Sequence, residues 1–188
     1  WSRMQREGYF VFSFVREPVE RFVSGFNEIN LRCHDKPQAL NHAFGQEKED
    51  IVLRAALFQH AVRRLIEGTN AEFCESRHML SQLDFLVAQD QRRMPAHFDF
   101  IGKVEEVHEA WKYIQERAGI PLENRSKIES SGKSGTEKPG KRLLPVLTMK
   151  QLWEDERGVD IIRRVCLLFW QDFSCLNYSL PDVCLSGG

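Results

Sequence analysis

Residues 9–24 read YFVFSFVREPVERFVS, an apolar run followed at once by a charged and then an amphipathic segment. The run from Tyr9 to Val15 is short and almost wholly apolar, which predicts a strand buried on both faces, as in a parallel sheet. Pro18 suits the first turn of a helix, where its missing N–H costs nothing. Apolar residues then recur on one helical face, and we expect this helix to end near Arg32.

The rest of the chain repeats the same signals. Apolar residues at helical spacing predict further helices over residues 47–67, 105–118, 148–153 and 158–173. Residues 98–104 read FDFIGKV and predict a second buried strand. Ser, Gly and Lys dominate residues 123–142, which predicts a long loop, and residues 182–188 predict a loose tail.

A strand and helix, then helices, then a second strand and helix indicate the α/β class. The 188 residues fit one ordinary domain, and a hydrophobic fraction of 42% is enough for a core. Two strands are few for a free-standing sheet, so we expect further strands before Trp1. The net charge of -1 argues against a nucleic-acid partner, and no apolar run is long enough for a transmembrane helix.

The five cysteines are Cys33, Cys74, Cys166, Cys175 and Cys184. They form no Cys-x-x-Cys pair, so the sequence predicts no zinc site and no other metal. One or two disulfides can form in a secretory compartment, but spacing alone does not pair them. Buried or free thiols are the alternative.

The junction of the first strand and helix carries the best candidate for chemistry. Arg16 follows the strand at its carboxyl end, the edge at which open α/β sheets bind ligands. The helix that begins near Pro18 directs its N-terminus to the same edge, and helix N-termini favour anions. Arg16 adds a planar fork of donors, and Ser24 adds a hydroxyl, which together predict a phosphate site. The alternatives are a surface ion pair of Arg16 with Glu17 or Glu20 and a solvated serine.

Three segments in order resemble one family. Residues 14–26, FVREPVERFVSGF, resemble the 3′-phosphate motif of the Golgi carbohydrate sulfotransferases, a group with the chondroitin 4-sulfotransferases and the HNK-1 sulfotransferase and, more distantly, heparan and uronyl 2-sulfotransferases. Residues 97–105, HFDFIGKVE, resemble a segment that precedes a helix in that family. Residues 172–181, DFSCLNYSLP, resemble its C-terminal motif, so the resemblance spans Tyr9 to Pro181.

The resemblance implies a sulfotransferase with a P-loop-NTPase-like, three-layer α/β fold, incomplete and helix-rich in this chain. It implies the sulfate donor PAPS (3′-phosphoadenylyl sulfate), with Arg16 and Ser24 holding its 3′-phosphate. Lys133 and Ser134 lie where some relatives place a second loop over the nucleotide, although a flexible linker explains them equally well. His78 aligns loosely with a family histidine and is a candidate for the acceptor site.

Two further points follow from these motifs. Arg21 also matches the 3′-phosphate motif, and we expect a structural or electrostatic role for it. Gly132, Lys133 and Ser134 do not make a phosphate-binding P-loop, because Lys127 stands where that motif requires its first glycine.

The same resemblance predicts what lies outside the chain. Sulfuryl transfer needs a cation at the leaving phosphate and a general base for the acceptor hydroxyl, and we expect both upstream of Trp1. Residues 1–188 would then be the C-terminal part of a single sulfotransferase domain, inactive alone. The family implies a glycan acceptor and a lumenal place at the Golgi membrane, anchored by a segment outside this chain.

Two other functions remain open from the sequence. A non-catalytic module of the same fold would bind a nucleotide or a glycan without transfer. A helical protein-interaction domain would present the faces of residues 47–67 and 158–173 to a partner.

Overall fold

The computed structural model describes residues 7–33, 50–68, 79–86, 98–119 and 146–185. The chain divides into two compact units. The first comprises residues 1–16 and 94–143, and the second comprises residues 17–93 and 144–188. The described part is rich in helices and contains one small parallel sheet, in agreement with the α/β class.

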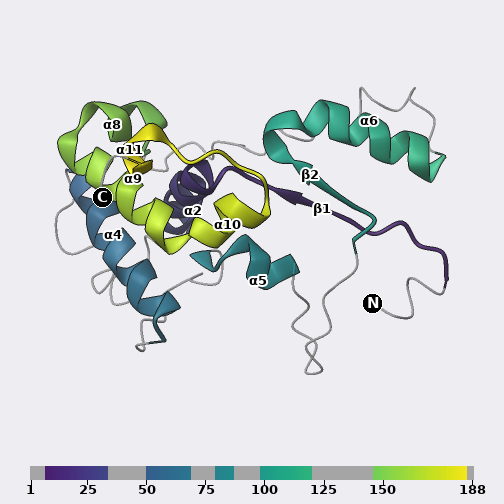
Figure 1. Ribbon diagram of the computed structural model, residues 1–188. Helices are drawn as coiled ribbons and strands as arrows, with labels where there is room; N and C mark the ends of the chain where they lie inside the picture. The colour runs from purple at the N-terminus through teal and green to yellow at the C-terminus, as the bar shows by residue number, and fades with distance from the viewer. Residues whose placement is uncertain (1–6, 34–49, 69–78, 87–97, 120–145, 186–188) are drawn as a thin grey trace, which may run out of the picture. The chain divides into compact units, whose positions relative to one another are not determined.

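The first unit holds the sheet. Strand β1, Phe12–Val15, pairs in parallel with β2, Phe100–Lys103 (Figure 1). The register sets Phe12 opposite Phe100 and Val15 opposite Lys103. The strands are followed along the chain by the short 3-10 helix η2, Val104–Glu106, and by α6, Val107–Ala118.

Helix α6 packs closely on β2. A Cβ at Gly102 would lie 2.9 Å from ring carbons of Phe100 and Phe14 and 3.0 Å from the Cβ of Ala110. The strand therefore needs glycine at this position so that the helix can approach it. The helix ends at Gly119, whose φ of 66° is the left-handed conformation that glycine adopts without strain.

The expectation that both strands are buried on two faces is wrong for the described residues. Phe12 is 38% exposed and Ile101 is 43% exposed. Tyr9, within the run that predicts the first strand, lies before β1 and is 61% exposed. The physical reason is that strand side chains project from the two faces of a sheet, and the described elements of this unit provide a single long helix, α6, to cover them.

The second unit is a helical assembly around one core (Figure 1). Its described helices are α2, Pro18–Arg32; α4, Ile51–Ile66; α5, Gln82–Leu86; α8, Met149–Glu154; α9, Glu156–Leu168; α10, Trp170–Cys175; and α11, Asp182–Leu185. The helix predicted from Pro18 to Arg32 is confirmed at both ends.

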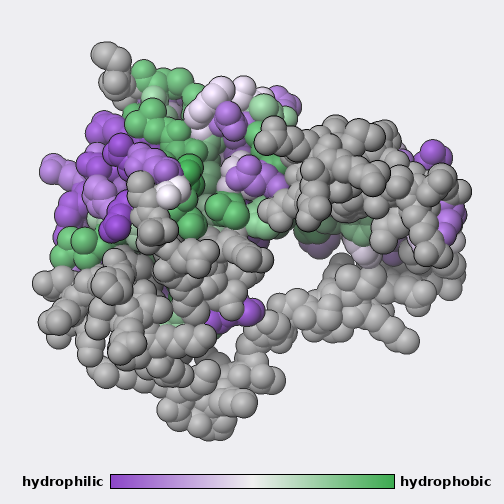
Figure 2. All heavy atoms as spheres, turned by 90° about the horizontal axis from the view of Figure 1, so that it is seen from below, coloured by the Kyte–Doolittle hydropathy of each residue, from purple (hydrophilic) through white to green (hydrophobic). Residues whose placement is uncertain are grey.

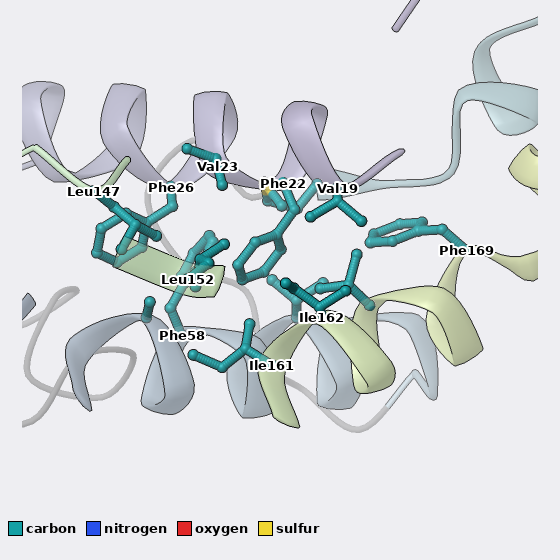
Figure 3. Packing of buried hydrophobic residues seen from close by; sticks show 14 of the residues in the cluster. Val19, Phe22, Val23, Phe26, Phe58, Leu147, Leu152, Ile161, Ile162 and Phe169 are labelled. Atoms are coloured by element: carbon teal, nitrogen blue, oxygen red, sulfur yellow. The ribbon is translucent and has the colours of Figure 1, made fainter. Parts of the chain in front are cut away.

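Aromatic side chains of α2 and α4 meet at the centre of this core (Figure 3). The ring centroids of Phe22 and Phe58 are 5.7 Å apart, and those of Phe26 and Phe58 are 5.4 Å apart. Ile161 and Ile162 of α9 pack into the same cluster. The 3.6-residue spacing that predicts each amphipathic helix therefore also identifies its buried face.

The single helix predicted over residues 158–173 is two helices in the structure. Helix α9 ends at Leu168 and α10 begins at Trp170, with Phe169 between them at φ −114° and ψ 26°. Phe169 is 2% exposed, so the break turns a large side chain into the core. Periodicity alone does not detect this break, because both helices present an apolar face.

The C-terminal residues also differ from the loose tail that the sequence predicts. Asp182–Leu185 form α11, and a disulfide joins Cys184 to Cys166 of α9. Cys33 is disulfide-bonded as well, whereas Cys175 is free and exposed. Spacing did not predict these pairings, which depend on how the helices pack.

Some apolar side chains remain on the surface. Leu167 is 76% exposed and Trp170 is 57% exposed, at the junction of α9 and α10. The space-filling view shows hydrophobic patches beside hydrophilic ones on the visible face (Figure 2). Single exposed apolar residues are normal in soluble proteins and require no partner.

Candidate functional site

Arg16 follows Val15, the last residue of β1, and its side chain is half-buried. Because β1 and β2 are parallel, their carboxyl ends meet at one edge of the sheet. Lys103 ends β2 opposite Val15 at that edge. Two cationic residues therefore mark the edge at which sheets of this class bind ligands, which is the position that the sequence predicts for Arg16.

The N-terminus of α2 is capped by its own chain. Glu17 is the N-cap residue, and its carboxylate accepts a hydrogen bond of 2.7 Å from the backbone N–H of Glu20. Pro18 begins the helix without an N–H. The helix end thus has fewer free donors than the sequence suggested.

Ser24 is exposed on α2, in the second unit. Asn27 lies three residues further along the same helix and is firmly held. Its amide donates a 2.8 Å hydrogen bond to the Leu147 carbonyl and accepts one of 2.9 Å from the Leu147 N–H. The Ser24 hydroxyl therefore lies on a helix that is held in place, three residues further on, by the hydrogen bonds of Asn27.

The predicted site residues do not all belong to one unit. The boundary between the two units lies between Arg16 and Glu17, so Arg16 belongs to the sheet unit and Ser24 to the helical unit. That both bind one phosphate stays a prediction. His78, Lys133 and Ser134 lie outside the described residues.

The structure adds one charged residue that the motif did not single out. Asp172 of α10 is 0% exposed. Its carboxylate accepts hydrogen bonds from the Ser81 hydroxyl at 2.5 Å and from the Gln82 N–H at 2.9 Å. Asp172 begins the C-terminal family segment, but no local pattern indicates that its partners lie at the start of α5.

Arg21 faces the same acidic surroundings. Burial lowers the pKa of its guanidinium, and the negative charges of Asp172 and Asp84 act in the opposite direction to raise it. A buried cation needs such partners, because removing it from water without them is costly. The expected structural or electrostatic role of Arg21 has a physical basis in these charges.

Described residues line a pocket in each unit, and neither of these two linings includes Arg16 or Ser24. One, of about 390 Å³, lies along β2 and α6, where Tyr113 and Phe100 stand beside Glu106 and Glu109. The other, of about 700 Å³, lies at the junction of α8 and α9.

Comparison with known proteins decides the family. The model of the Sulfotransferase family matches residues 1–179. The chain belongs to the sulfotransferase family. The family resemblance inferred from three short motifs is thereby confirmed, and the sulfotransferase match extends over nearly the whole chain.

A curated relative supports the carbohydrate branch of the sulfotransferases. Carbohydrate sulfotransferase 14 of Danio rerio is 30% identical over 127 residues. The match covers 60% of this chain and 31% of that protein, so the chain spans about a third of its relative's length. No solved structure matches the chain.

None of the described helices has both the length and the apolar content needed to cross a membrane. Within the same ranges, His, Cys, Asp and Glu side chains form no group of three or more that could hold a metal ion.

Proposed function

We propose that the full-length protein transfers the sulfuryl group of PAPS to a hydroxyl of a glycan acceptor. The observation that carries this proposal is the sulfotransferase family match over residues 1–179. PAPS is the donor that the family implies. The glycan acceptor is supported by the similarity to a carbohydrate sulfotransferase.

In this proposal, Arg16 and Ser24 bind the 3′-phosphate of PAPS. Arg16 stands at the carboxyl edge of a parallel strand, and a guanidinium forms charge-assisted bonds with phosphate oxygens. Ser24 is exposed on the helix that follows and has a hydroxyl to donate. Lys133 and Ser134 remain candidates for a second contact with the nucleotide, and His78 for a contact with the acceptor.

The wider proposal concerns the fold and the catalytic groups. The two units would be parts of one P-loop-NTPase-like, three-layer domain whose remaining strands are supplied by other parts of the full-length protein. The cation at the leaving phosphate and the general base would come from there as well. Residues 1–188 by themselves would then not transfer sulfate.

We further propose that the protein works in the Golgi lumen, held by a membrane segment outside this chain. The disulfide between Cys166 and Cys184 supports an oxidising compartment, because such bonds are rare where thiols are kept reduced. The resemblance to the Golgi carbohydrate sulfotransferases implies the same compartment.

The test is nucleotide binding and sulfate transfer by the full-length protein. PAP, the product of the donor, should bind saturably, and binding should weaken in Arg16→Ala. Radiolabelled sulfate from PAPS should appear in a glycan acceptor. Glu20→Gln, an exposed change on the first turn of α2, is the matched control for folding.

The outcomes separate the proposal from its alternatives. Saturable PAP binding without any transfer would favour a non-catalytic module of the same fold. Binding that Arg16→Ala leaves unchanged would remove the proposed donor site.

A further inference from the structure

Asp172 is a buried carboxylate that the proposed chemistry does not use. Besides Ser81 and Gln82, it accepts a 3.3 Å hydrogen bond from the N–H of Leu83. All three donors belong to the first residues of α5 or to the residue before it. These bonds satisfy the oxygens of Asp172, but they do not neutralise its charge, which a buried carboxylate also requires.

Helix α2 brings a cation to this place. Arg21 and Gly25 are one turn apart and share a helix face. A Cβ at Gly25 would lie 2.4 Å from the sulfur of Met79, so this face of α2 closely approaches the segment that leads into α5. The negative charge of Asp172 and, more weakly, that of Asp84 act to raise the pKa of the Arg21 guanidinium.

Ser24 stands between two anchored positions of α2. Arg21 precedes it by three residues, and Asn27, bonded to the backbone of Leu147, follows it by three. Residues three apart are neighbours on a helix surface. Asn27 is hydrogen-bonded on one side of Ser24, and on the other side Arg21 interacts electrostatically with Asp172, so both neighbours can restrict the rotation of α2 about its axis in addition to the apolar packing of its buried face.

We propose that Arg21 and Asp172 are positioning residues that set the rotation of α2 and so direct the Ser24 hydroxyl toward the 3′-phosphate. Apolar packing alone tolerates small rotations, whereas a buried charge with a defined partner favours one setting. This inference rests on the proposed function, because it gives the pair its purpose through Ser24. The pair also connects the first family segment, which contains Arg21, with the last, which contains Asp172.

The test compares two nucleotides in the full-length protein. PAP has a 3′-phosphate and 5′-AMP has none, so the ratio of their dissociation constants isolates that phosphate. Arg21→Gln and Asp172→Asn should each reduce the preference for PAP by about three- to tenfold, the effect of a lost hydroxyl contact. A merely structural defect lowers the competent fraction and weakens both nucleotides equally, which leaves the ratio unchanged.

One matched control changes another arginine of α2, and the other changes Arg21 conservatively. Arg32→Gln removes an arginine of α2 that pairs only with Glu28 at the surface among the described contacts, and it should keep the wild-type ratio. Arg21→Lys retains the charge and should restore part of the preference.

The role of Ser24 is tested by a double-mutant cycle. In a Ser24→Ala background, Arg21→Gln should have no further effect on the PAP preference, since Arg21 is proposed to act through Ser24. An undiminished effect in that background would mean that Arg21 acts on the phosphate directly by its charge, and it would overturn the positioning role. An unchanged ratio in both Arg21→Gln and Asp172→Asn would overturn it too.

Arg16→Ala separates this inference from the function on which it rests. If Arg16→Ala reduces the PAP preference and the Arg21 and Asp172 variants do not, only the positioning role fails. If Arg16→Ala has no effect either, the proposed 3′-phosphate site itself fails.

Discussion

Arg16 and Ser24 differ in charge, and this difference predicts the order of their effects. Arg16 is itself charged and can donate two hydrogen bonds to the phosphate, for which we expect about 1.5–3 kcal/mol, whereas Ser24 donates one bond from a neutral hydroxyl, for which we expect the smaller range of about 0.5–1.5 kcal/mol. We expect Arg16→Ala to cost the larger and Ser24→Ala the smaller amount of PAP binding free energy, measured by calorimetry on the full-length protein. Ser24 is exposed, so its truncation should leave the thermal transition unchanged. The reverse order would show that the roles are wrongly assigned.

Two helical glycines should differ in how much a Gly→Ala change lowers the free energy of unfolding. A Cβ at Gly158 would lie 2.3 Å from the carbonyl oxygen and 2.6 Å from the Cα of Leu152, both backbone atoms that cannot turn aside. We expect Gly158→Ala to lower the free energy of unfolding by about 1–3 kcal/mol, the usual cost of overpacking. Urea denaturation measures it.

Gly25→Ala is the matched comparison. Its new Cβ would meet only the flexible side chain of Met79, which can move. The gain in helix propensity, about 1 kcal/mol, offsets that adjustment, so Gly25→Ala should change stability little. If Gly25→Ala proves the more damaging of the two, backbone contact is not the deciding factor.

At this scale the sequence predicted the types of residue but not their partners. Arg16 and Ser24 follow from a local pattern of strand, helix and charge. The bonds of Asp172 to Ser81 and Gln82 join positions about ninety residues apart, and no local pattern carries that information. The pairing of Cys166 with Cys184 depends on the packing of α11 in the same way.

At the scale of elements, one ion pair connects two helix N-termini. Asp50 caps α4, and Arg157 in the first turn of α9 approaches it with an N–O distance of 2.6 Å. The backbone N–H of Leu53 and then the Arg157 guanidinium hold the pKa of Asp50 below its usual value. A lowered folded-state pKa stabilises the protein above the unfolded pKa of about 3.9, and this stability is lost as pH falls through the folded value.

Asp50→Asn isolates the charge, because asparagine caps a helix as well as aspartate does. We expect this variant to be slightly less stable than the wild type at pH 7 and equally stable at a pH below the folded-state pKa of Asp50, which lies under the unfolded value of about 3.9. The effect is small because the pair is exposed to solvent. Urea denaturation at both pH values measures it, and a difference that persists in acid would assign the loss to the cap instead.

The elements themselves were largely predictable. Strong periodicity together with start and stop signals, such as Pro18 in the first turn of α2 and the glycine after α4, gave the existence and type of the long helices. The break at Phe169 was missed because apolar periodicity continues across it. The exposure of β1 was missed because an apolar run does not reveal which elements will pack on the two faces of its sheet.

At the scale of the whole molecule, the disulfide between Cys166 and Cys184 holds the C-terminal residues to the helical unit. The two cysteines are 18 residues apart, and closing a loop of this size restricts the unfolded chain by about 3 kcal/mol. The side chain of Arg163 adds a 3.2 Å hydrogen bond to the Val183 carbonyl. Both contacts fasten α11 to α9.

Cys184→Ser should therefore lower the free energy of unfolding by about 2–4 kcal/mol and release α11 to proteolysis. Cys175→Ser is the matched control, because Cys175 is a free and exposed thiol whose loss should change neither quantity. Urea denaturation and limited proteolysis followed by mass spectrometry measure the two effects. Equal stability of the two variants would mean that covalent closure of this loop does not contribute to the stability of the helical unit.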